Sequence, residues 1–218
     1  AELAEDLNML PFPHNSEIAP GMYKRRPAGQ ICKKRNIGYI MSSRGCSYKC
    51  TFCASPYIYK GQVRFRNIEN IIAEMKELIN VYGVKEIKFI DDNLAFKKEH
   101  LVELCEEIIK NNISVPWVAT GFRANNADDE VISIMKKSGC YNINIGIESA
   151  AKEILLNVKK NETVEEISNA INIIHKHGII CGGLFILGLP GETKETMKET
   201  IDFALKSNLT LATFNVLD

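Results

Sequence analysis

The apolar residues of this chain follow two spacings, one typical of short strands and one typical of amphipathic helices. Apolar residues three and four positions apart predict helices over 68–83, 97–112, 128–139, 150–158, 163–178 and 193–208. Short apolar segments between them predict strands over 36–42, 84–91, 115–122, 141–149, 179–190 and 209–217. Thr163 and Glu166 form a capping-box pattern where one of these helices begins.

A helix separates each predicted strand from the next, which implies parallel strands joined by helical crossovers. This order fits an open barrel of six strands that stops after the sixth, and it also fits a doubly wound sheet. In both architectures ligands gather at the carboxyl ends of the strands. Residues 1–35 are rich in proline and show neither the helical nor the strand spacing of apolar residues. We therefore expect an irregular leader or linker before a single core domain over 36–218.

Composition narrows the possible functions. Lys plus Arg and Asp plus Glu number 27 each, so the net charge is zero, and we do not expect nucleic acid as a partner because a general grip on it needs a basic surface. No apolar segment is long enough to span a membrane, and the acidic start lacks the features of a signal peptide, so we expect no membrane partner and a cytoplasmic location. The chain begins at Ala1 rather than Met, which suggests an excerpt of a longer protein.

Three cysteines, Cys46, Cys50 and Cys53, follow the first predicted strand in a C-x3-C-x2-C pattern. Three thiolates on one loop can bind three irons of a cubane cluster and leave the fourth iron open to an external ligand, whereas closed clusters use four cysteines. A zinc site or a closed ferredoxin-type cluster is the alternative. Zinc pairs of the C-x2-C kind normally need a second pair, and the other cysteines stand singly in the sequence.

The cysteine motif, with Phe52 directly before the last cysteine, resembles that of the radical S-adenosylmethionine (SAM) superfamily, and the resemblance extends from about Ile37 to the chain end. It implies an α/β fold, a parallel partial (β/α)6 barrel truncated after the sixth strand. It also implies a [4Fe-4S] cluster held by the three cysteines and a SAM molecule bound to the open iron. One-electron reduction, by a donor such as flavodoxin or ferredoxin, would release a 5′-deoxyadenosyl radical.

The resemblance also implies roles for residues at later strand ends. Asp91, Asp92 and Asn93 stand where the family places acceptors for the methionyl ammonium, often as Gly-Gly-Glu, although one of them could instead cap the next helix. Arg123 follows the third strand, and its guanidinium suits a carboxylate of cofactor or substrate; an ordinary surface ion pair is the alternative.

Glu148 and Ser149 end the fourth strand at the family's ribose-binding position, with a helix cap as the alternative for Ser149. Gly188 and Leu189 follow the fifth strand, where glycine lets an adenine ring approach the backbone. The sequence from Ile186 to Glu192 matches the second half of the family's Gly-x-Ile-x-Gly-x-x-Glu pattern.

Several motifs together resemble the branch of the family that carries an upstream cobalamin-binding domain: DLNMLPFP, CTFCASP, IDDN, GIESA and FILGLPGET. Members of that branch methylate or rearrange small molecules, so the resemblance implies cobalamin bound by a domain outside this chain. A methylthiotransferase acting on transfer RNA or protein is one alternative. A non-catalytic electron-transfer or zinc-binding module is another.

Overall fold

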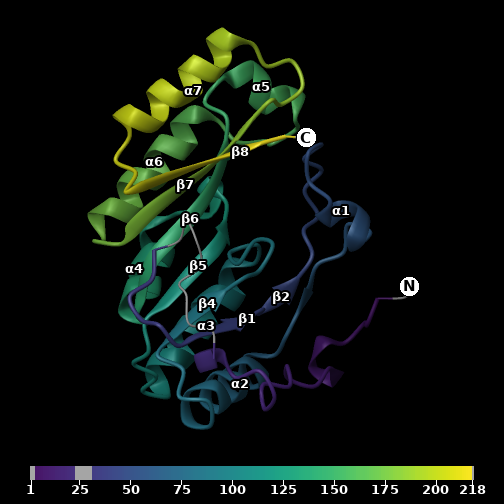
Figure 1. The fold of residues 1–218 in the computed structure, drawn as a ribbon, viewed down its shortest axis with the longest axis vertical. Helices are drawn as coiled ribbons and strands as arrows, with labels where there is room; N and C mark the ends of the chain where they lie inside the picture. The colour runs from purple at the N-terminus through teal and green to yellow at the C-terminus, as the bar shows by residue number, and fades with distance from the viewer. Residues whose placement is uncertain (1–2, 23–30, 218) are drawn as a thin grey trace.

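The computed structural model describes residues 3–22 and 31–217, and its central feature is one sheet of six parallel strands in the order β1-β4-β5-β6-β7-β8 (Figure 1). Each strand therefore pairs with the next strand of the core along the chain, as helical crossovers require. The predicted six parallel strands are confirmed. They are β1 (Ile37–Ile40), β4 (Glu86–Phe89), β5 (Trp117–Phe122), β6 (Cys140–Glu148), β7 (Ile180–Leu187) and β8 (Leu211–Val216).

The predicted helices are also present. Helix α6 begins at the N-cap Thr163, and the capping box with Glu166 is formed; Thr193 and Thr196 form the same motif at the start of α7. The helices of the core are α2 (Ile68–Asn80), α3 (Lys98–Lys110), α4 (Asp129–Lys137), α5 (Lys152–Asn157), α6 (Val164–Lys176) and α7 (Lys194–Lys206).

The two faces of the sheet differ in polarity. Ile87 and Phe89 belong to the main hydrophobic core together with buried residues of α2 and α3, and Ile143 and Ile145 belong to the same core together with residues of α4 and α6. Because side chains alternate along a strand, Lys88, Asn142 and Asn144 point to the other face. The helices cover the apolar face, and the polar face forms the inner side of the open barrel.

Residues 31–34 close the amino end of this inner face. The backbone N–H groups of Lys33 and Lys34 each donate to Glu86 Oε2 at 2.7 Å, and the Tyr141 hydroxyl donates to Glu86 Oε1 at 2.7 Å. Glu86 is fully buried, so these bonds are what make its burial tolerable. The last part of the predicted leader is thus built into the core.

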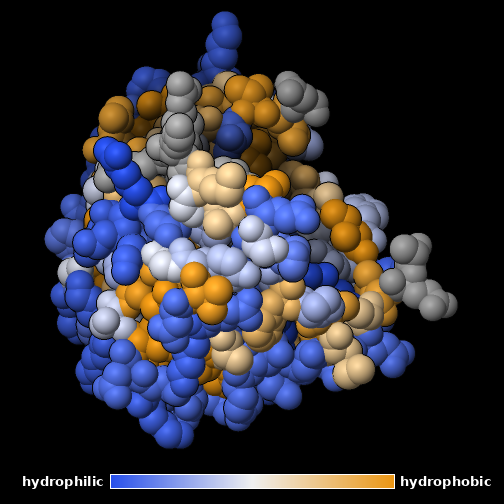
Figure 2. All heavy atoms as spheres, turned by 60° about the horizontal axis from the view of Figure 1, so that its bottom comes forward, coloured by the Kyte–Doolittle hydropathy of each residue, from blue (hydrophilic) through white to orange (hydrophobic). Residues whose placement is uncertain are grey.

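The rest of the described leader runs as irregular chain with two short 3-10 helices, η1 (Leu7–Met9) and η2 (Pro20–Met22); residues 23–30 of the predicted leader and Asp218 lie outside the described residues. On the face turned forward in Figure 2, hydrophobic atoms form separate patches among hydrophilic ones. Among the described residues, no helix has the length and apolar character needed to cross a membrane.

The sequence analysis missed a small second sheet. Strands β2 (Ser43–Arg44) and β3 (Arg64–Phe65) pair antiparallel, and a short helix, α1 (Ser55–Ile58), lies between them in the chain. Strands of two residues carry no detectable alternation, which explains the omission. Their pairing closes the base of the excursion that carries all three motif cysteines.

Candidate functional site

Thr51 and Phe52, between the second and third motif cysteines, attach the cysteine loop to the carboxyl end of the sheet. Thr51 N donates to Val158 O at 3.0 Å, just beyond α5. Phe52 packs against a small hydrophobic cluster made of Ala151, Ile154, Val158 and Leu189, together with Ile186. The aromatic residue before the last cysteine therefore anchors the loop against α5 and the segment that follows β7.

The three thiols of this loop lie within electrostatic reach of one another. Burial raises the pKa of Cys46 and of Cys53, and the neighbouring cysteines raise both pKa values further. Cys50 is buried, and Arg123 Nη1 lies 3.7 Å from its sulfur, while Ser55 N donates to the Cys53 sulfur at 3.4 Å. Donors and a cation directed at sulfur suit thiolates, the form in which cysteine binds metal.

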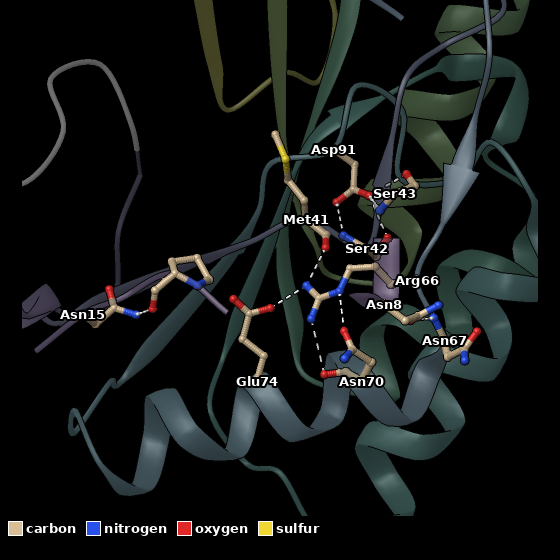
Figure 3. A network of polar contacts seen from close by, with 11 residues as sticks. Asn8, Asn15, Met41, Ser42, Ser43, Arg66, Asn67, Asn70, Glu74 and Asp91 are labelled. Atoms are coloured by element: carbon tan, nitrogen blue, oxygen red, sulfur yellow. Dashed lines mark hydrogen bonds and ion pairs between the residues drawn. The ribbon is translucent and has the colours of Figure 1, made fainter. Parts of the chain in front are cut away.

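Asp91, at the end of β4, holds the chain that leads into the cysteine loop. Its carboxylate accepts hydrogen bonds from Ser42 N and Oγ at 3.1 and 2.7 Å and from Ser43 N and Oγ at 2.5 and 2.6 Å (Figure 3). Burial raises the pKa of Asp91, and these donors oppose that effect. All four of these hydrogen bonds come from the protein itself, so the Asp91 carboxylate has little remaining capacity to accept from a ligand.

Arg66 fixes the same segment from the opposite side. Its guanidinium donates to Met41 O at 2.9 Å and forms an ion pair with Glu74 on α2, while its backbone N donates to Ser42 O at 2.9 Å (Figure 3). Its Nε also donates to Asn70 Oδ1 at 2.8 Å. Residues 41–43 are thus tied to β4, α2 and β3 before the chain reaches Cys46.

The two residues after Asp91 have different surroundings. Asp92 is exposed, and its Oδ2 accepts from Gly45 N at 3.0 Å. Asn93 is only 1% exposed; its Nδ2 donates to Asn126 Oδ1 at 3.3 Å, but its Oδ1 has no partner among the described residues. A buried carbonyl oxygen without a donor is costly, and in a native protein it commonly marks a place for a ligand or water.

Gly121 explains how β5 comes close to this strand end. A Cβ atom at Gly121 would lie 2.2 Å from Asp91 O, so only glycine fits.

Four buried charged residues connect the cysteine loop to the end of β6. Arg123 forms an ion pair with Glu162 at 3.4 Å and also donates to Lys160 O. Lys160 lies 3.3 Å from both Glu162 and Glu148. Arg123 also stacks over Tyr48 of the cysteine loop, with its Cζ 3.8 Å from the ring centroid. We call Arg123, Glu148, Lys160 and Glu162 the buried ion network.

Glu148 sits in an unusual backbone conformation. Its φ is +66°, and the pairing of β6 with β7 shifts register between Gly146 and Glu148. A non-glycine residue in this region is strained, and such strain collects at functional sites. Burial raises the pKa of Glu148, and Lys160 opposes that effect.

Its neighbour Ser149 is fully buried and is bonded internally. The hydroxyl lies 3.1 Å from Thr200 Oγ1 on α7 and accepts from Ala151 N at 3.1 Å. These bonds tie the end of β6 to α7 and to the start of α5, whose N-cap residue is Ala151.

Gly188 and Leu189 lie in the turn after β7. Gly188 has a φ of +88°, and both backbone N–H groups point at Glu192 Oε2, with Leu189 N at 3.2 Å. Leu189 is buried against Phe52. Glu192 therefore closes this turn, and the turn meets the cysteine loop through apolar contact.

The structure thus brings the cysteines, Arg123 and Glu148 into one connected region at the ends of β5 and β6. Asn93 follows β4 and Gly188 follows β7, the strands on either side of that pair. Sequence reasoning missed Lys160, Glu162, Ser42 and Ser43. Lys160 and Glu162 lie in a polar loop after α5 that resembles any solvated turn, so no sequence signal pointed to their burial.

Three cysteines outside the loop, Cys105, Cys140 and Cys181, are buried in the core. Burial raises the pKa of Cys105 and of Cys181 to about 12, which keeps both thiols protonated. Cys140 lies near Cys105, and burial raises its pKa as well. Buried, protonated thiols of this kind are inert core residues.

Comparison with known proteins gives consistent results. The model of the radical SAM superfamily matches residues 40–204. An uncharacterised methyltransferase of Pyrococcus horikoshii is 34% identical over 98% of this chain and 45% of its own length. The cytidylyl-2-hydroxyethylphosphonate methyltransferase of Streptomyces wedmorensis is 27% identical over 97% of this chain and 41% of its own length.

Among solved structures, the radical SAM methyltransferase TsrM from Kitasatospora setae, with cobalamin and a [4Fe-4S] cluster bound, superposes with a TM-score of 0.76. The match covers 83% of this chain and 36% of TsrM at 21% identity, a level that speaks for the fold alone. The chain spans less than half the length of these relatives.

Proposed function

We propose, starting from the fact that the chain belongs to the radical SAM superfamily, that it is the catalytic core of an enzyme that cleaves SAM reductively. The observation that carries the proposal is the buried ion network, which joins the three-cysteine loop to the end of β6. In this assignment residues 36–218 form the core and residues 1–35 the leader. The [4Fe-4S] cluster, once bound and reduced, supplies the electron that breaks a carbon–sulfur bond of SAM to give methionine and a 5′-deoxyadenosyl radical.

Cys46, Cys50 and Cys53 are the proposed ligands of three irons. Phe52 holds their loop on α5, and Arg123 places its positive charge beside the Cys50 sulfur. That charge stabilises the thiolate and offsets the negative charge that three thiolates bring to a buried place.

The methionyl end of SAM carries an ammonium and a carboxylate, and the site has a group for each. Asn93 Oδ1 is a buried acceptor without a partner, and Asp92 is the adjacent carboxylate. Lys160 lies 3.3 Å from each of two carboxylates, longer than the 2.7–2.9 Å typical of charge-assisted hydrogen bonds. We assign Lys160 with Arg123 to the methionyl carboxylate.

We assign the adenosyl end of SAM to residues at the carboxyl ends of β6 and β7. Glu148 is the proposed acceptor for the ribose hydroxyls, and the backbone at Gly188 and Leu189 is the proposed contact of the adenine. Asp91 and Ser149 are already bonded inside the protein, so we assign them to building the site rather than to contacting SAM.

The substrate is proposed to be a small molecule that is methylated, with cobalamin held by another part of the protein. The relatives named above are methyltransferases, which favours methyl transfer over methylthio transfer. A cavity of about 1120 Å³ lies between the leader and the first two core strands, lined by Phe12, Tyr39, Met41 and Ile90. None of the residues proposed to bind the cluster or SAM lines this cavity, so we assign it no role in the reaction.

The test is anaerobic reconstitution with iron and sulfide, followed by reduction with dithionite and an assay for 5′-deoxyadenosine. SAM binding is measured alongside, because binding reports on the site even where turnover needs the rest of the protein. We expect a [4Fe-4S] spectrum that changes when SAM is added, together with 5′-deoxyadenosine. An intact cluster that neither binds nor cleaves SAM would overturn the proposal.

Cys50→Ala and Cys105→Ala form a matched pair for the ligand assignment. Both remove one buried thiol, but only Cys50 belongs to the loop. We expect Cys50→Ala to lose the cubane cluster and Cys105→Ala to keep it. A full cubane cluster in Cys50→Ala would contradict the assignment of the ligands.

A further inference from the structure

The charge of this neutral chain is distributed unevenly along the sequence. No Asp or Glu occurs between Glu17 and Glu69, and that stretch contains the cysteine loop. Its basic residues are Lys24, Arg25, Arg26, Lys33, Lys34, Arg35, Arg44, Lys49, Lys60, Arg64 and Arg66. Because the whole chain balances at 27 charges of each sign, the remainder carries the compensating negative charge.

Some of these cations are used inside the fold. Arg66 is held by Glu74, and Lys33 lies over the ring of Tyr141. Lys49 and Lys60, in contrast, are exposed, and neither takes part in an ion pair with any described residue. Lys49 directly precedes Cys50, and Lys60 follows α1. The two free positive charges thus flank Cys50 and Cys53 in the chain.

Between these lysines, α1 presents apolar side chains to solvent. Tyr57 is 81% exposed and Ile58 is 60% exposed, and the helix that carries them begins two residues after Cys53. Exposed aromatic and aliphatic side chains, with lysines close by in the chain, suit an interface that has an apolar centre and a polar rim. The acidic residue that contacts this loop is Asp92, and its carboxylate accepts a hydrogen bond from Gly45 N rather than pairing with Lys49 or Lys60.

We propose that Lys49, Tyr57, Ile58 and Lys60, here called the α1 surface, are the docking surface for a small acidic electron-carrier protein of the flavodoxin or ferredoxin class. The inference rests on the proposed function, because reductive SAM cleavage consumes one electron per event. That electron passes from the carrier, which is oxidised by one electron, to the cluster, which is reduced by one. The α1 surface joins directly to Cys53, so a carrier docked there lies beside the metal ligands.

Charge complementarity selects an acidic carrier. Rim lysines act mainly on the association rate, and steering of this kind weakens steeply as salt is added. Tyr57 and Ile58 act mainly on the lifetime of the encounter, because apolar contacts change the dissociation rate more than the association rate. Moderate salt weakens apolar burial far less than it weakens charge steering.

The test uses the anaerobically reconstituted protein and flavodoxin hydroquinone as the probe. Stopped-flow absorbance follows flavodoxin oxidation at low and high salt, and every rate is expressed per bound cluster. In Lys49→Glu/Lys60→Glu we expect the second-order rate at low salt to fall by about tenfold or more, with most of its salt dependence lost. Lys60→Glu alone, further from the cysteines in the chain, should give part of the fall.

The matched control is Lys85→Glu/Lys137→Glu, which makes the same charge change at exposed lysines preceding β4 and β6, at the opposite end of the sheet. Its rate with flavodoxin should stay within about twofold of the parent protein, since it leaves the charge beside the cluster unchanged. Tyr57→Ser should lower the rate while leaving the salt dependence in place.

Dithionite separates failure of this inference from failure of the proposed function. With dithionite, all of these variants should form 5′-deoxyadenosine at the rate of the parent protein. If the parent protein forms none with dithionite, the proposed function fails. If dithionite works and the flavodoxin rate is the same in Lys49→Glu/Lys60→Glu as in the control, the α1 surface is not the docking surface.

Discussion

The carboxyl ends of β4 and β6 each combine a residue that is fully bonded inside the protein with a neighbour that is not. At β4, Asp91 accepts from the backbone and hydroxyl groups of Ser42 and Ser43, while Asn93 Oδ1 has no partner among the described residues. At β6, Ser149 is bonded to Thr200 and Ala151, while Glu148 has a strained backbone and one ion pair of 3.3 Å.

We expect this contrast to separate residues that build the site from residues that contact the ligand. A side chain whose bonding capacity is used internally fixes the geometry of its neighbours, and replacing it should cost stability. A buried polar group with spare capacity costs stability in the free protein and regains it when a ligand binds. Four substitutions test the contrast, taken in order of their expected effect on the free energy of unfolding.

Asp91→Ala should have the largest effect. It leaves the buried donors of Ser42 and Ser43 without an acceptor, so we expect a loss of about 3–5 kcal/mol in the free energy of unfolding. Denaturant unfolding of the protein before cluster reconstitution measures this loss, and iron content after reconstitution should fall as well. Asp92→Ala is the control and should cost less than about 1 kcal/mol, because Asp92 is exposed and accepts only from Gly45. If Asp91→Ala and Asp92→Ala had equal free energies of unfolding, the claim that Asp91 builds the site would be wrong.

Ser149→Ala should come second. The substitution leaves Ala151 N–H without its acceptor and Thr200 Oγ1 without one partner, so we expect a loss of about 1–2 kcal/mol. SAM affinity, measured by equilibrium dialysis on the reconstituted protein, should stay within about twofold, since the Ser149 hydroxyl is bonded to Thr200 and Ala151 and is assigned no contact with SAM. A large loss of SAM affinity at unchanged stability would place Ser149 among the ligand contacts instead.

The contrast also shows where sequence analysis succeeds and where it stops. Strand and helix periods located all six strands of the core. Parallel order then placed Asp91, Asn93, Glu148 and Ser149 at the carboxyl ends of strands, where folds of this kind bind ligands. The sequence alone does not distinguish Asp91 from Asn93, two residues later, as a ligand contact. Which of the two is already bonded depends on Ser42 and Ser43, which are distant in the chain.

The same limit hid the buried ion network. Lys160 and Glu162 are common surface residue types in a polar loop, and only their contacts with Arg123 and Glu148 show that they are buried. Periodicity describes which face an element buries, but it carries no information on charged side chains that pair across elements.

Glu148→Gln should change stability little and SAM binding more. The amide keeps the shape of the side chain, and Lys160 keeps its ion pair with Glu162, so we expect a change in the free energy of unfolding of about 1 kcal/mol or less. A charged acceptor for ribose hydroxyls contributes about 1.5–3 kcal/mol, so SAM affinity should fall by about tenfold or more. Glu162→Gln is the comparison, because that carboxylate pairs with both Arg123 and Lys160 and should cost more stability. A normal SAM affinity in Glu148→Gln would contradict the ribose assignment.

Asn93→Ala should have the smallest effect on stability and still weaken SAM binding. The Asn93 Oδ1 atom makes no hydrogen bond in the described protein, and Nδ2 makes one of 3.3 Å to Asn126, so we expect unfolding to change by about 0.5 kcal/mol or less. Loss of an acceptor for the methionyl ammonium should reduce SAM affinity by about tenfold. Asn126→Ala removes the same Asn93–Asn126 bond but keeps the acceptor, so its SAM affinity should stay near that of the parent protein. If Asn93→Ala instead destabilises the protein as Ser149→Ala does, and binds SAM normally, then Asn93 belongs with the building residues and β4 no longer shows the division seen at β6.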